Sequence, residues 1–329
     1  MTEVKTNSFL DKQTQQKMPK RIAVAWSGGA DSTALLLMLQ SQNFDVAAWH
    51  IDHGWAENSS ELALDLGRKA ESWNIPFLTK RLCKPTFNIE AESRRLRYEA
   101  FAALAVETNC YHLALGHHAD DQAETIYMRL LQGSGVAGCQ GMQTYRKQGD
   151  LHLWRPMLES TRYDMEKYLK NKKVAWLEDP SNMDCELWRN KIRHKLFPAM
   201  VENGANPQQL FLRFGQQARI VQHDIEKLAE HIVIHYNDNA DESTCSMSWD
   251  EWSEQVKAVR VFLLQKMIGI LFADGKVFGR RHFEAIEQWK NNGGNGWVNL
   301  SGCHLEKQGK NLKLFRGFKG LENIRNRKV

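Results

Sequence analysis

The hydrophobic pattern of the first 200 residues alternates between short apolar runs and longer segments with an apolar residue every three or four positions. The short runs have the length of buried strands, and the longer segments have the period of amphipathic helices. The predicted strands cover residues 22–26, 45–51, 77–82, 111–116 and 151–156. The predicted helices cover residues 32–39, 61–73, 88–108, 120–131 and 162–172. Strands that alternate with helices indicate βαβ units, so we expect an α/β fold, a parallel twisted sheet with helices on both faces.

The stretch 22–39, IAVAWSGGADSTALLLML, joins the first strand to the first helix through a Ser-Gly-Gly turn at 27–29. Free backbone amides and the helix dipole at such a turn favour an anion, and phosphate is the natural ligand. The spacing matches neither a Walker loop nor a Rossmann turn. The alternative is a plain strand-to-helix turn with Ser32 as the N-cap. Asp31 favours the phosphate interpretation, because a carboxylate beside an anion site can hold a metal ion that the phosphates also bind.

Two further loops at the same predicted sheet edge are rich in histidine and carboxylate. Right-handed crossovers bring the carboxyl ends of parallel strands to one edge, where ligands bind in open sheets. The loop after the second strand reads HIDHGW, and the loop after the fourth reads GHHADDQAET. In the latter, Asp121 and Glu124 lie three positions apart on one helix face, and His117 precedes Asp121 by four positions. We expect these side chains to converge with Asp31 in a metal or amine site.

The remaining polar residues of that loop have a simpler interpretation. His118 and Asp120 immediately precede or begin the predicted helix, where such residues commonly cap the free amides. The glycine-rich segment 132–142 that follows the helix is either a plain connection or a lid over the site.

A basic helix is predicted over residues 186–200. Trp188, Ile192 and Leu196 repeat every four positions and should face the core. The rest of the helix carries no acid to balance its cationic side chains, which are Arg189, Lys191, Arg193, His194 and Lys195. A one-sided basic helix can be a plain solvated surface. The missing acids favour an anionic partner instead, either the phosphates of ATP or an RNA backbone.

Three domains are expected from these patterns. Residues 1–20 lack an apolar period and predict a flexible N-terminal tail, and residues 21–205 form the α/β unit. From residue 206 to 329 helical patterns dominate, over 208–237, 255–272 and 279–289, and two short strands close the chain within 293–315. This mainly helical domain either holds a substrate or is structural or dimerising.

Composition narrows the class of protein without identifying it. The chain has 329 residues, of which 42% are hydrophobic, and a net charge of only +5, so its global charge says little about nucleic acid. No membrane-spanning run or secretory signal is recognisable, so we expect a cytoplasmic protein with no membrane partner. The six cysteines are scattered without any C-x-x-C pair, which argues against structural zinc, an iron–sulfur cluster or a disulfide framework.

The motifs resemble a known family. SGGADS at 27–32 is similar to the PP-loop of the N-type ATP pyrophosphatases, which include amidotransferase synthetases, NAD synthetases and tRNA thiolases. The combination with further motifs resembles the tRNA(Ile)-lysidine synthetase family, closely over about residues 21–200. These motifs are HIDHGW at 50–55, ESRRLRY at 92–98, GHHADDQAETIYMRLLQGSG at 116–135, WLEDPSN at 176–182 and RNKIRH at 189–194. The chain is expected to be a short form without the last C-terminal domain of longer members.

The resemblance implies a two-step reaction on RNA. The wobble cytidine C34 of a CAU-anticodon tRNA(Ile) is adenylated at its C2 oxygen by ATP with Mg²⁺, and pyrophosphate leaves. The side-chain amine of free L-lysine then attacks C2, AMP leaves and lysidine remains. The C-terminal domain is implied to bind the tRNA. A homodimer is one open alternative for the assembly, which the sequence does not determine.

The resemblance also assigns roles to individual residues. Asp31 would hold Mg²⁺, and Asp121 and Glu124 would bind the lysine amine and help remove its proton, with His117 assisting at the phosphate or metal. Arg97 and Arg189 would neutralise the α-phosphate and help to hold the flipped cytidine. The ATP cradle would comprise Ser27, Gly28, Gly29, Ala30, Asp31 and Ser32. Contacts to tRNA would come from Arg193, His194 and Lys195.

Two alternatives stay open from the residues. A tRNA thiolase would activate a base in the same way but needs paired cysteines or a cluster, and Cys139 alone lies near the predicted site. An inactive RNA-binding or nucleotide-binding module would have lost the acidic residues, which are present. The chain departs from the family pattern at Trp55, Ala56 and Gln132, which puts phosphate or tRNA contacts there in doubt.

Overall fold

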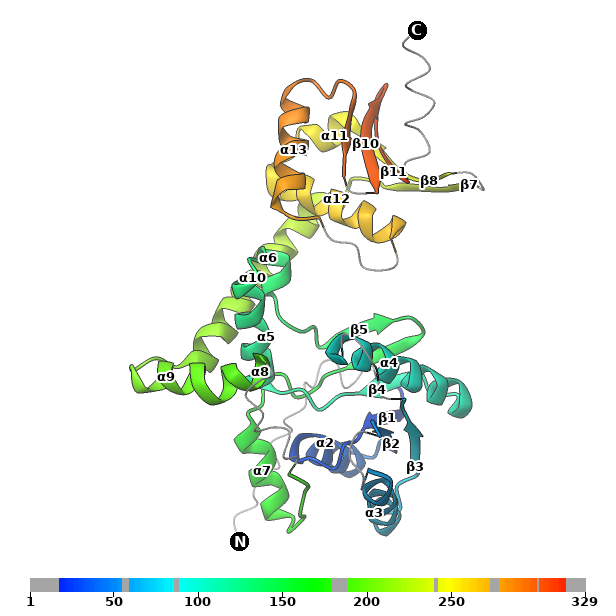
Figure 1. Ribbon diagram of the computed structural model, residues 1–329, viewed down its shortest axis with the longest axis vertical. Helices are drawn as coiled ribbons and strands as arrows, with labels where there is room; N and C mark the ends of the chain where they lie inside the picture. The colour runs from blue at the N-terminus through cyan, green and yellow to red at the C-terminus, as the bar shows by residue number, and fades with distance from the viewer. Residues whose placement is uncertain are drawn as a thin grey trace. The chain divides into compact units, whose positions relative to one another are not determined.

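The computed structural model describes residues 18–54, 59–83, 85, 89–178, 188–239, 242–272, 278–300 and 302–317. The chain divides into two compact units, Met1–Ala218 and Arg219–Val329 (Figure 1). This division lies within helix α10 (Pro207–Ala229), somewhat later than the domain boundary predicted at 205–206. The predicted flexible tail, 1–20, lies outside the described residues as far as residue 17.

The first unit is built on a six-stranded sheet with strand order β3-β2-β1-β4-β6-β5. The pairs β1–β2, β2–β3, β1–β4 and β4–β6 are parallel, which confirms the predicted α/β fold. The five parallel strands are β1 (Arg21–Ala25), β2 (Asp45–Asp52), β3 (Phe77–Arg81), β4 (His112–Ala114) and β6 (Leu151–Trp154). The sixth strand, β5 (Tyr145–Gln148), is antiparallel and was not predicted. Its sequence YRKQ is polar because it lies at an exposed edge of the sheet.

Helices cover both faces of this sheet because alternate strand residues point to opposite sides. On one face, Ile22 and Val24 of β1 pack with α2 (Ala30–Ser41), α3 (Ser59–Ser72) and α7 (Arg162–Asn171). On the other face, residues such as Ala23, Leu113 and Leu153 pack with α4 (Ile89–Thr108). The two layers fix the carboxyl ends of β1, β4 and β6 side by side.

The predicted basic helix is broken into three parts, so the prediction of one helix over 186–200 is wrong. The described part comprises α8 (Trp188–Lys191), the π-helical turn η2 (Ile192–Leu196) and α9 (Phe197–Glu202). A π-turn changes the helical phase. Ile192 and Phe197, five positions apart, therefore pack on α5 (Ala119–Leu131), while Trp188 is 44% exposed instead of lying in the core.

The segment 132–142 is pinned to α5. The Gln122 side chain donates a hydrogen bond to the carbonyl of Met142 (2.9 Å) and accepts one from its amide (2.6 Å). The segment includes the short helix α6 (Val136–Cys139). Whether it acts as a lid stays a prediction.

The second unit holds more strand than the sequence pattern predicts. An antiparallel sheet with strand order β7-β8-β11-β10-β9 packs against α12 (Lys257–Leu271), α11 (Trp249–Ser253) and α13 (Arg280–Asn291). The strands are β7 (His235–Asn239), β8 (Glu242–Ser248), β9 (Trp297–Asn299), β10 (Cys303–Gln308) and β11 (Asn311–Arg316). The helix predicted to reach residue 237 ends at Ala229, because the polar edge strand β7 has no apolar period. No helix within the described residues is long and apolar enough to span a membrane.

Candidate active site

The Ser-Gly-Gly turn after β1 closes on itself through its own serines. The Ser27 amide donates to Ser32 Oγ (3.2 Å), and Ser32 Oγ donates to the carbonyl of Gly29 (3.2 Å). Gly28 has a φ of +83°, a conformation that favours glycine. The N-cap of α2 is Gly29 rather than Ser32, so the alternative with Ser32 as the N-cap is wrong. The first-turn amides of α2 thus open toward the sheet edge, where they can bind an anion.

The loops that follow β1 and β4 are in direct contact, as predicted for neighbouring parallel strands. A Cβ atom on Gly116 would lie 3.1 Å from the carbonyl carbon of Asp31 and 3.1 Å from the Ser32 amide nitrogen. The start of the WLEDPSN motif also lies on the turn, because the Leu177 amide donates to the carbonyl of Gly28 (2.9 Å). Residues 179–182 of that motif lie outside the described part of the chain.

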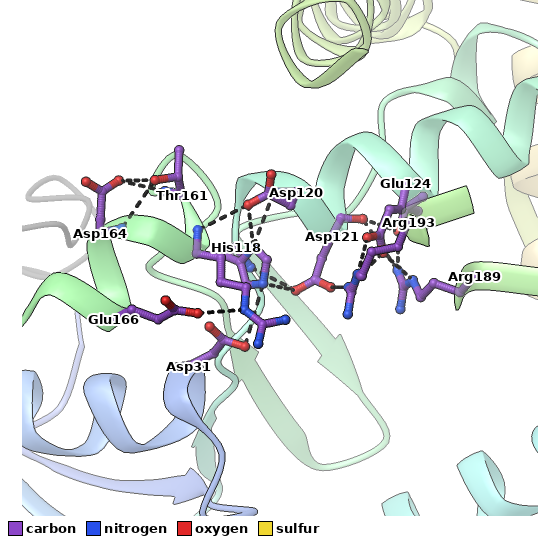
Figure 2. A network of polar contacts seen from close by, with 12 residues as sticks. Asp31, His118, Asp120, Asp121, Glu124, Thr161, Asp164, Glu166, Arg189 and Arg193 are labelled. Carbon is purple, nitrogen blue, oxygen red and sulfur yellow. Dashed lines mark hydrogen bonds and ion pairs between the residues drawn. The ribbon is translucent and has the colours of Figure 1, made fainter. Parts of the chain in front are cut away.

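His118 lies between three carboxylates at the contact of these loops (Figure 2). Its Nε2 is 3.6 Å from Asp31 Oδ2 and 3.4 Å from Asp121 Oδ2, and its Nδ1 is 3.2 Å from Asp120 Oδ2. The side chain is only 3% exposed. Burial acts to lower the pKa of His118, but the three carboxylates outweigh it and raise that pKa above its ordinary value. The His118 imidazole thus lies between Asp31 and the acidic residues of α5.

The capping predictions for His118 and Asp120 have different outcomes. His118 is the N-cap of α5: its Nδ1 accepts from the Asp120 amide (3.2 Å), and the Asp121 carboxylate accepts from the His118 amide (3.1 Å). The Asp120 carboxylate instead accepts from the Arg162 amide at the start of α7 (3.1 Å). Burial opposes ionisation of Asp120, yet His118 and the Arg162 amide hold its pKa at about 2.

The acidic partners of Arg189 and Arg193 lie on α5. Arg193 grips Glu124 with two hydrogen bonds, Nε to Oε1 (2.7 Å) and Nη2 to Oε2 (3.0 Å), and its Nη2 also reaches Asp121 Oδ1 (3.2 Å). Arg189 Nε lies 3.1 Å from Glu124 Oε2, and its Nη2 donates to Thr125 Oγ1 (2.7 Å). The Glu124 side chain is 1% exposed, and its burial raises its pKa despite both arginines. The two arginines, four positions apart, therefore share one face directed at the acidic pair (Figure 2).

A second cluster next to this one is cationic. Burial, together with the charges of Arg155, Arg189 and Arg97, lowers the pKa of His117 to about 3, while the charge of Asp121 opposes this shift. His117 Nδ1 is buried and has no hydrogen-bond partner among the residues that the structure describes. The imidazole of His117 is therefore neutral at physiological pH, and the predicted convergence of His117 with Asp121 is electrostatic rather than a direct hydrogen bond.

Asp31 fits a magnesium ion that is shared with phosphate. Within the described part of the chain its Oδ1 is buried without a hydrogen-bond partner, and burial raises its pKa against the opposing charge of His118. Among the described residues no group of three or more His, Cys, Asp and Glu side chains could hold a metal. Mg²⁺ is commonly bound by one or two carboxylates together with substrate phosphates. Asp31 provides one such carboxylate. It lies in the segment 27–32, which we call the phosphate-type turn.

Comparisons with known proteins show the family to which the chain belongs. The model of the PP-loop domain family matches residues 2–200. A tRNA(Ile)-lysidine synthase from Chlamydia caviae is 32% identical over 270 residues, which cover 81% of this chain and 83% of the relative. The chain belongs to the tRNA(Ile)-lysidine synthase family. The resemblance to that family, which was inferred from sequence motifs between residues 27 and 194, is thereby confirmed.

Other relatives of the lysidine synthase family are longer than this chain. The tRNA(Ile)-lysidine synthase of Legionella pneumophila is 37% identical over 197 residues, which cover 56% of this chain but only 44% of the relative. A solved structure, the U34-tRNA thiolase NcsA from Methanococcus maripaludis, superposes with a TM-score of 0.51 at 17% identity over 62% of this chain and 72% of the thiolase. That likeness shows the shared fold alone.

The residues that the lysidine synthase motifs single out fall into two groups in the structure, the network of Figure 2 and the pair His117 and Arg97. Asp31, Asp121, Glu124 and Arg189 lie in the network of Figure 2, together with Arg193. Arg193 was expected to contact tRNA, but its guanidinium is directed at the acids. The tRNA contacts of Arg193, His194 and Lys195 stay predictions, with the Lys195 side chain exposed.

Two residues of the site escaped the sequence pattern. His118 was interpreted only as a cap, although the three carboxylates around it in the same or a neighbouring loop were a signal for a charged centre. Arg155 directly follows the apolar strand β6, and a charged residue at the carboxyl end of a buried strand is the signal that could have identified it.

The neutral state of His117 predicts a pH effect on stability. The pKa of His117 is about 3 in the folded protein and near 6.5 when unfolded, so between these values the unfolded state binds one more proton. We expect wild-type stability, relative to His117→Gln, to fall by about 1.4 kcal/mol per pH unit from about pH 6 to pH 4. Urea unfolding at a series of pH values measures this difference. Parallel curves for the two proteins would show that His117 titrates normally.

Proposed function

We propose that this chain ligates free L-lysine to C2 of the wobble cytidine of a CAU-anticodon tRNA(Ile), using ATP and releasing AMP and pyrophosphate. The observation that supports it best is the contact between the phosphate-type turn and the acidic pair Asp121 and Glu124, linked through His118. A site for an activated phosphate and a site for a cationic amine lie next to each other. That arrangement suits an amine that attacks an adenylated base.

In the first step, the turn at 27–32 binds the β- and γ-phosphates through its amides and the N-terminus of α2. Asp31 would hold Mg²⁺, which neutralises charge on the departing pyrophosphate. Arg97 and Arg189 stabilise charge on the α-phosphate while the C2 oxygen of the cytidine bonds to phosphorus. His117 is neutral, so it can accept a hydrogen bond beside the phosphate.

In the second step, the lysine amine must lose a proton to become a nucleophile. Asp121 and Glu124 bind the ammonium form, and Asp121 Oδ2 or Glu124 accepts the proton as the C2–N bond forms. The C2–O bond then breaks and AMP leaves with its phosphate charge compensated by arginine. Burial of Glu124 raises its pKa, which makes it the better proton acceptor of the two.

Lysine shares its proposed site with Arg193. Three of the roughly four lone-pair positions of Glu124 already face arginine donors, so an incoming ammonium competes with the Arg193 guanidinium. We expect Arg193→Gln to lower the KM for lysine about fivefold, which corresponds to about 1 kcal/mol of relieved competition. Steady-state kinetics with lysine and tRNA varied separately measures this effect.

Lys195→Gln is the matched control for Arg193→Gln, because Lys195 is exposed on the same helical segment. It should leave the KM for lysine unchanged and raise only that for tRNA. If Arg193→Gln raised the KM for tRNA alone, Arg193 would be an RNA contact and the competition with lysine would be disproved.

The function itself is tested with the full chain, ATP, Mg²⁺, radiolabelled lysine and a CAU-anticodon tRNA(Ile) transcript. Lysine should enter the RNA with one AMP and one pyrophosphate released per lysine. The methionine tRNA with the same anticodon should accept less lysine. Release of AMP without lysine incorporation, or incorporation of sulfur instead, would overturn the proposal.

A sulfur-transfer function has less support from the residues near the site. Cys139 is buried, its thiol faces the carbonyl of Ser134 (3.3 Å), and burial raises its pKa. A thiol with a raised pKa is a poor nucleophile at neutral pH. An inactive module is disfavoured because the acidic residues are present and clustered. We further propose a cytoplasmic location, where ATP, lysine and tRNA meet, and tRNA binding by the second unit, while a homodimer stays a prediction.

A further inference from the structure

Arg155 is a buried arginine without an acidic partner. The residue is 4% exposed, its Nη1 donates to the carbonyl of Gln143 (2.9 Å), and its Nε has no hydrogen-bond partner among the described residues. A buried charge normally has a counter-charge, because removing a charge from water is costly. Among the described residues, no carboxylate forms an ion pair with Arg155. An uncompensated buried guanidinium therefore requires an explanation.

The position of Arg155 follows from the strand that precedes it. Residues Leu151 and Leu153 of β6 face the α4 side of the sheet, so Arg155, two positions further along, faces the same side. On that side Tyr98 of α4 hydrogen-bonds to Arg155. The backbone of β6 is held next to the loop that carries His117, because the Leu115 amide donates to the carbonyl of Trp154 (2.8 Å).

Arg155 is one of three arginines around Tyr98. The guanidinium carbons of Arg94 and Arg97 lie 5.2 and 5.9 Å from the centre of the Tyr98 ring. Neither forms an ion pair with any described carboxylate, whereas their neighbour Arg95 pairs with Glu92 and Glu99. Arg97 and Arg155 both act on the pKa of His117. Like charges at this spacing repel one another, so the cluster is suited to an anion that is absent from the chain itself.

We propose that Arg155 binds the α-phosphate of the nucleotide, as a fixed cation that acts together with Arg97 and His117. A guanidinium presents a planar fork of donors that matches two phosphate oxygens, and the unpartnered Nε is one such donor. The proposal rests on the proposed function for its choice of nucleotide. Strand β6 lies beside β4, whose following loop contacts the phosphate-type turn, so the cluster and the turn flank the same sheet edge.

The test compares AMP with adenosine, which differ only in the phosphate, by calorimetric titration of the full chain. We expect Arg155→Gln to weaken AMP binding by about 10- to 100-fold, because hydrogen bonds between charged groups contribute most of such a contact. Adenosine affinity should stay within about twofold. Arg155→Lys should fall between, because it keeps the charge and loses the fork. Arg68→Gln, an exposed arginine paired with Asp65 on α3, is the control and should change neither affinity.

Stability separates this role from a structural one. Because Arg155 carries an unpaired buried charge, Arg155→Gln should leave the melting temperature of the unliganded protein unchanged or raise it. Equal losses of AMP and adenosine affinity with a lower melting temperature in both Arg155 variants would show a structural role and overturn the proposal. Unchanged AMP affinity with weaker binding of tRNA alone would assign the residue to an RNA phosphate and also overturn it. If wild type bound AMP through Arg155 but incorporated no lysine, the proposed function would fail while the phosphate site stood.

Discussion

Asp31→Asn is expected to lower the rate of adenylate formation about a thousandfold. Asn keeps the shape of the side chain but removes the charge that would hold Mg²⁺ beside the departing pyrophosphate, and loss of one well-placed electrostatic group commonly costs this much. Asp31 Oδ1 forms no hydrogen bond with the residues that the structure describes, so the substitution removes the charge without breaking a contact of that atom with them. Release of labelled pyrophosphate from ATP, with tRNA present and lysine omitted, measures the first step alone.

Asp164→Asn is the matched control for this experiment. Asp164 accepts the Thr161 amide (2.8 Å) in the capping box of α7, so its loss should cost about 1 kcal/mol of stability and leave pyrophosphate release unchanged. If Asp31→Asn kept more than about a tenth of the wild-type rate, Asp31 would not be the residue that compensates the leaving group. An Asp31 variant that bound AMP normally and still released no pyrophosphate would place the defect in the chemistry.

The elements of the first unit could be predicted from the sequence because their signals are local. A run such as Ile22–Trp26 followed by two glycines and a helical period identifies β1, the turn and α2 without knowledge of the fold. Because the carboxyl ends of parallel strands meet at one edge of a sheet, the sequence then predicted that Asp31 and Asp121 lie together. The contact of Gly116 with the turn shows how the two loops meet there. The order of the strands and their right-handed crossover connections determine that contact.

The pairing of Arg189 and Arg193 with Glu124 could not be predicted because it joins segments more than 60 residues apart. Within its own helix the basic face has no acid, so the sequence pattern favoured an external anion. The π-helical turn η2 was equally hidden, since four-residue spacing of Trp188, Ile192 and Leu196 suggested an unbroken helix. Edge strands β5 and β7 were missed because exposed strands need no apolar residues.

The resulting site is divided by charge. Asp31, Asp121 and Glu124 form an acidic half that we propose accepts a metal ion and an amine, while Arg97, Arg155 and the neutral His117 form a cationic half that we propose accepts phosphate. His118 and the two arginines of the basic segment lie among the acids and reduce their mutual repulsion when lysine is absent. In the proposed reaction, lysine therefore binds in the acidic half and the adenylate phosphate in the cationic half.

Glu124→Gln is therefore expected to separate the two steps of the reaction. Adenylate formation should stay within about threefold of wild type, whereas attack by lysine should slow by about a hundredfold and require more lysine. Gln keeps a hydrogen-bond acceptor for Arg193 but removes the charge that binds the ammonium and takes its proton. Single-turnover experiments, in which the adenylated tRNA is formed first and lysine is then added, measure the second step directly.

Glu166→Gln is the control, because Glu166 also pairs with an arginine, Arg162 at 3.1 Å, but in an i,i+4 pair on α7 outside the proposed lysine site. It should leave both steps unchanged and alter stability by less than about 0.5 kcal/mol. Glu124→Gln should be less stable than wild type, because two arginines lose a buried counter-charge, so its AMP affinity must be shown to be intact. If only the adenylation step slowed while lysine reacted normally, Glu124 would serve the phosphate half, and the division of the site by charge would be wrong.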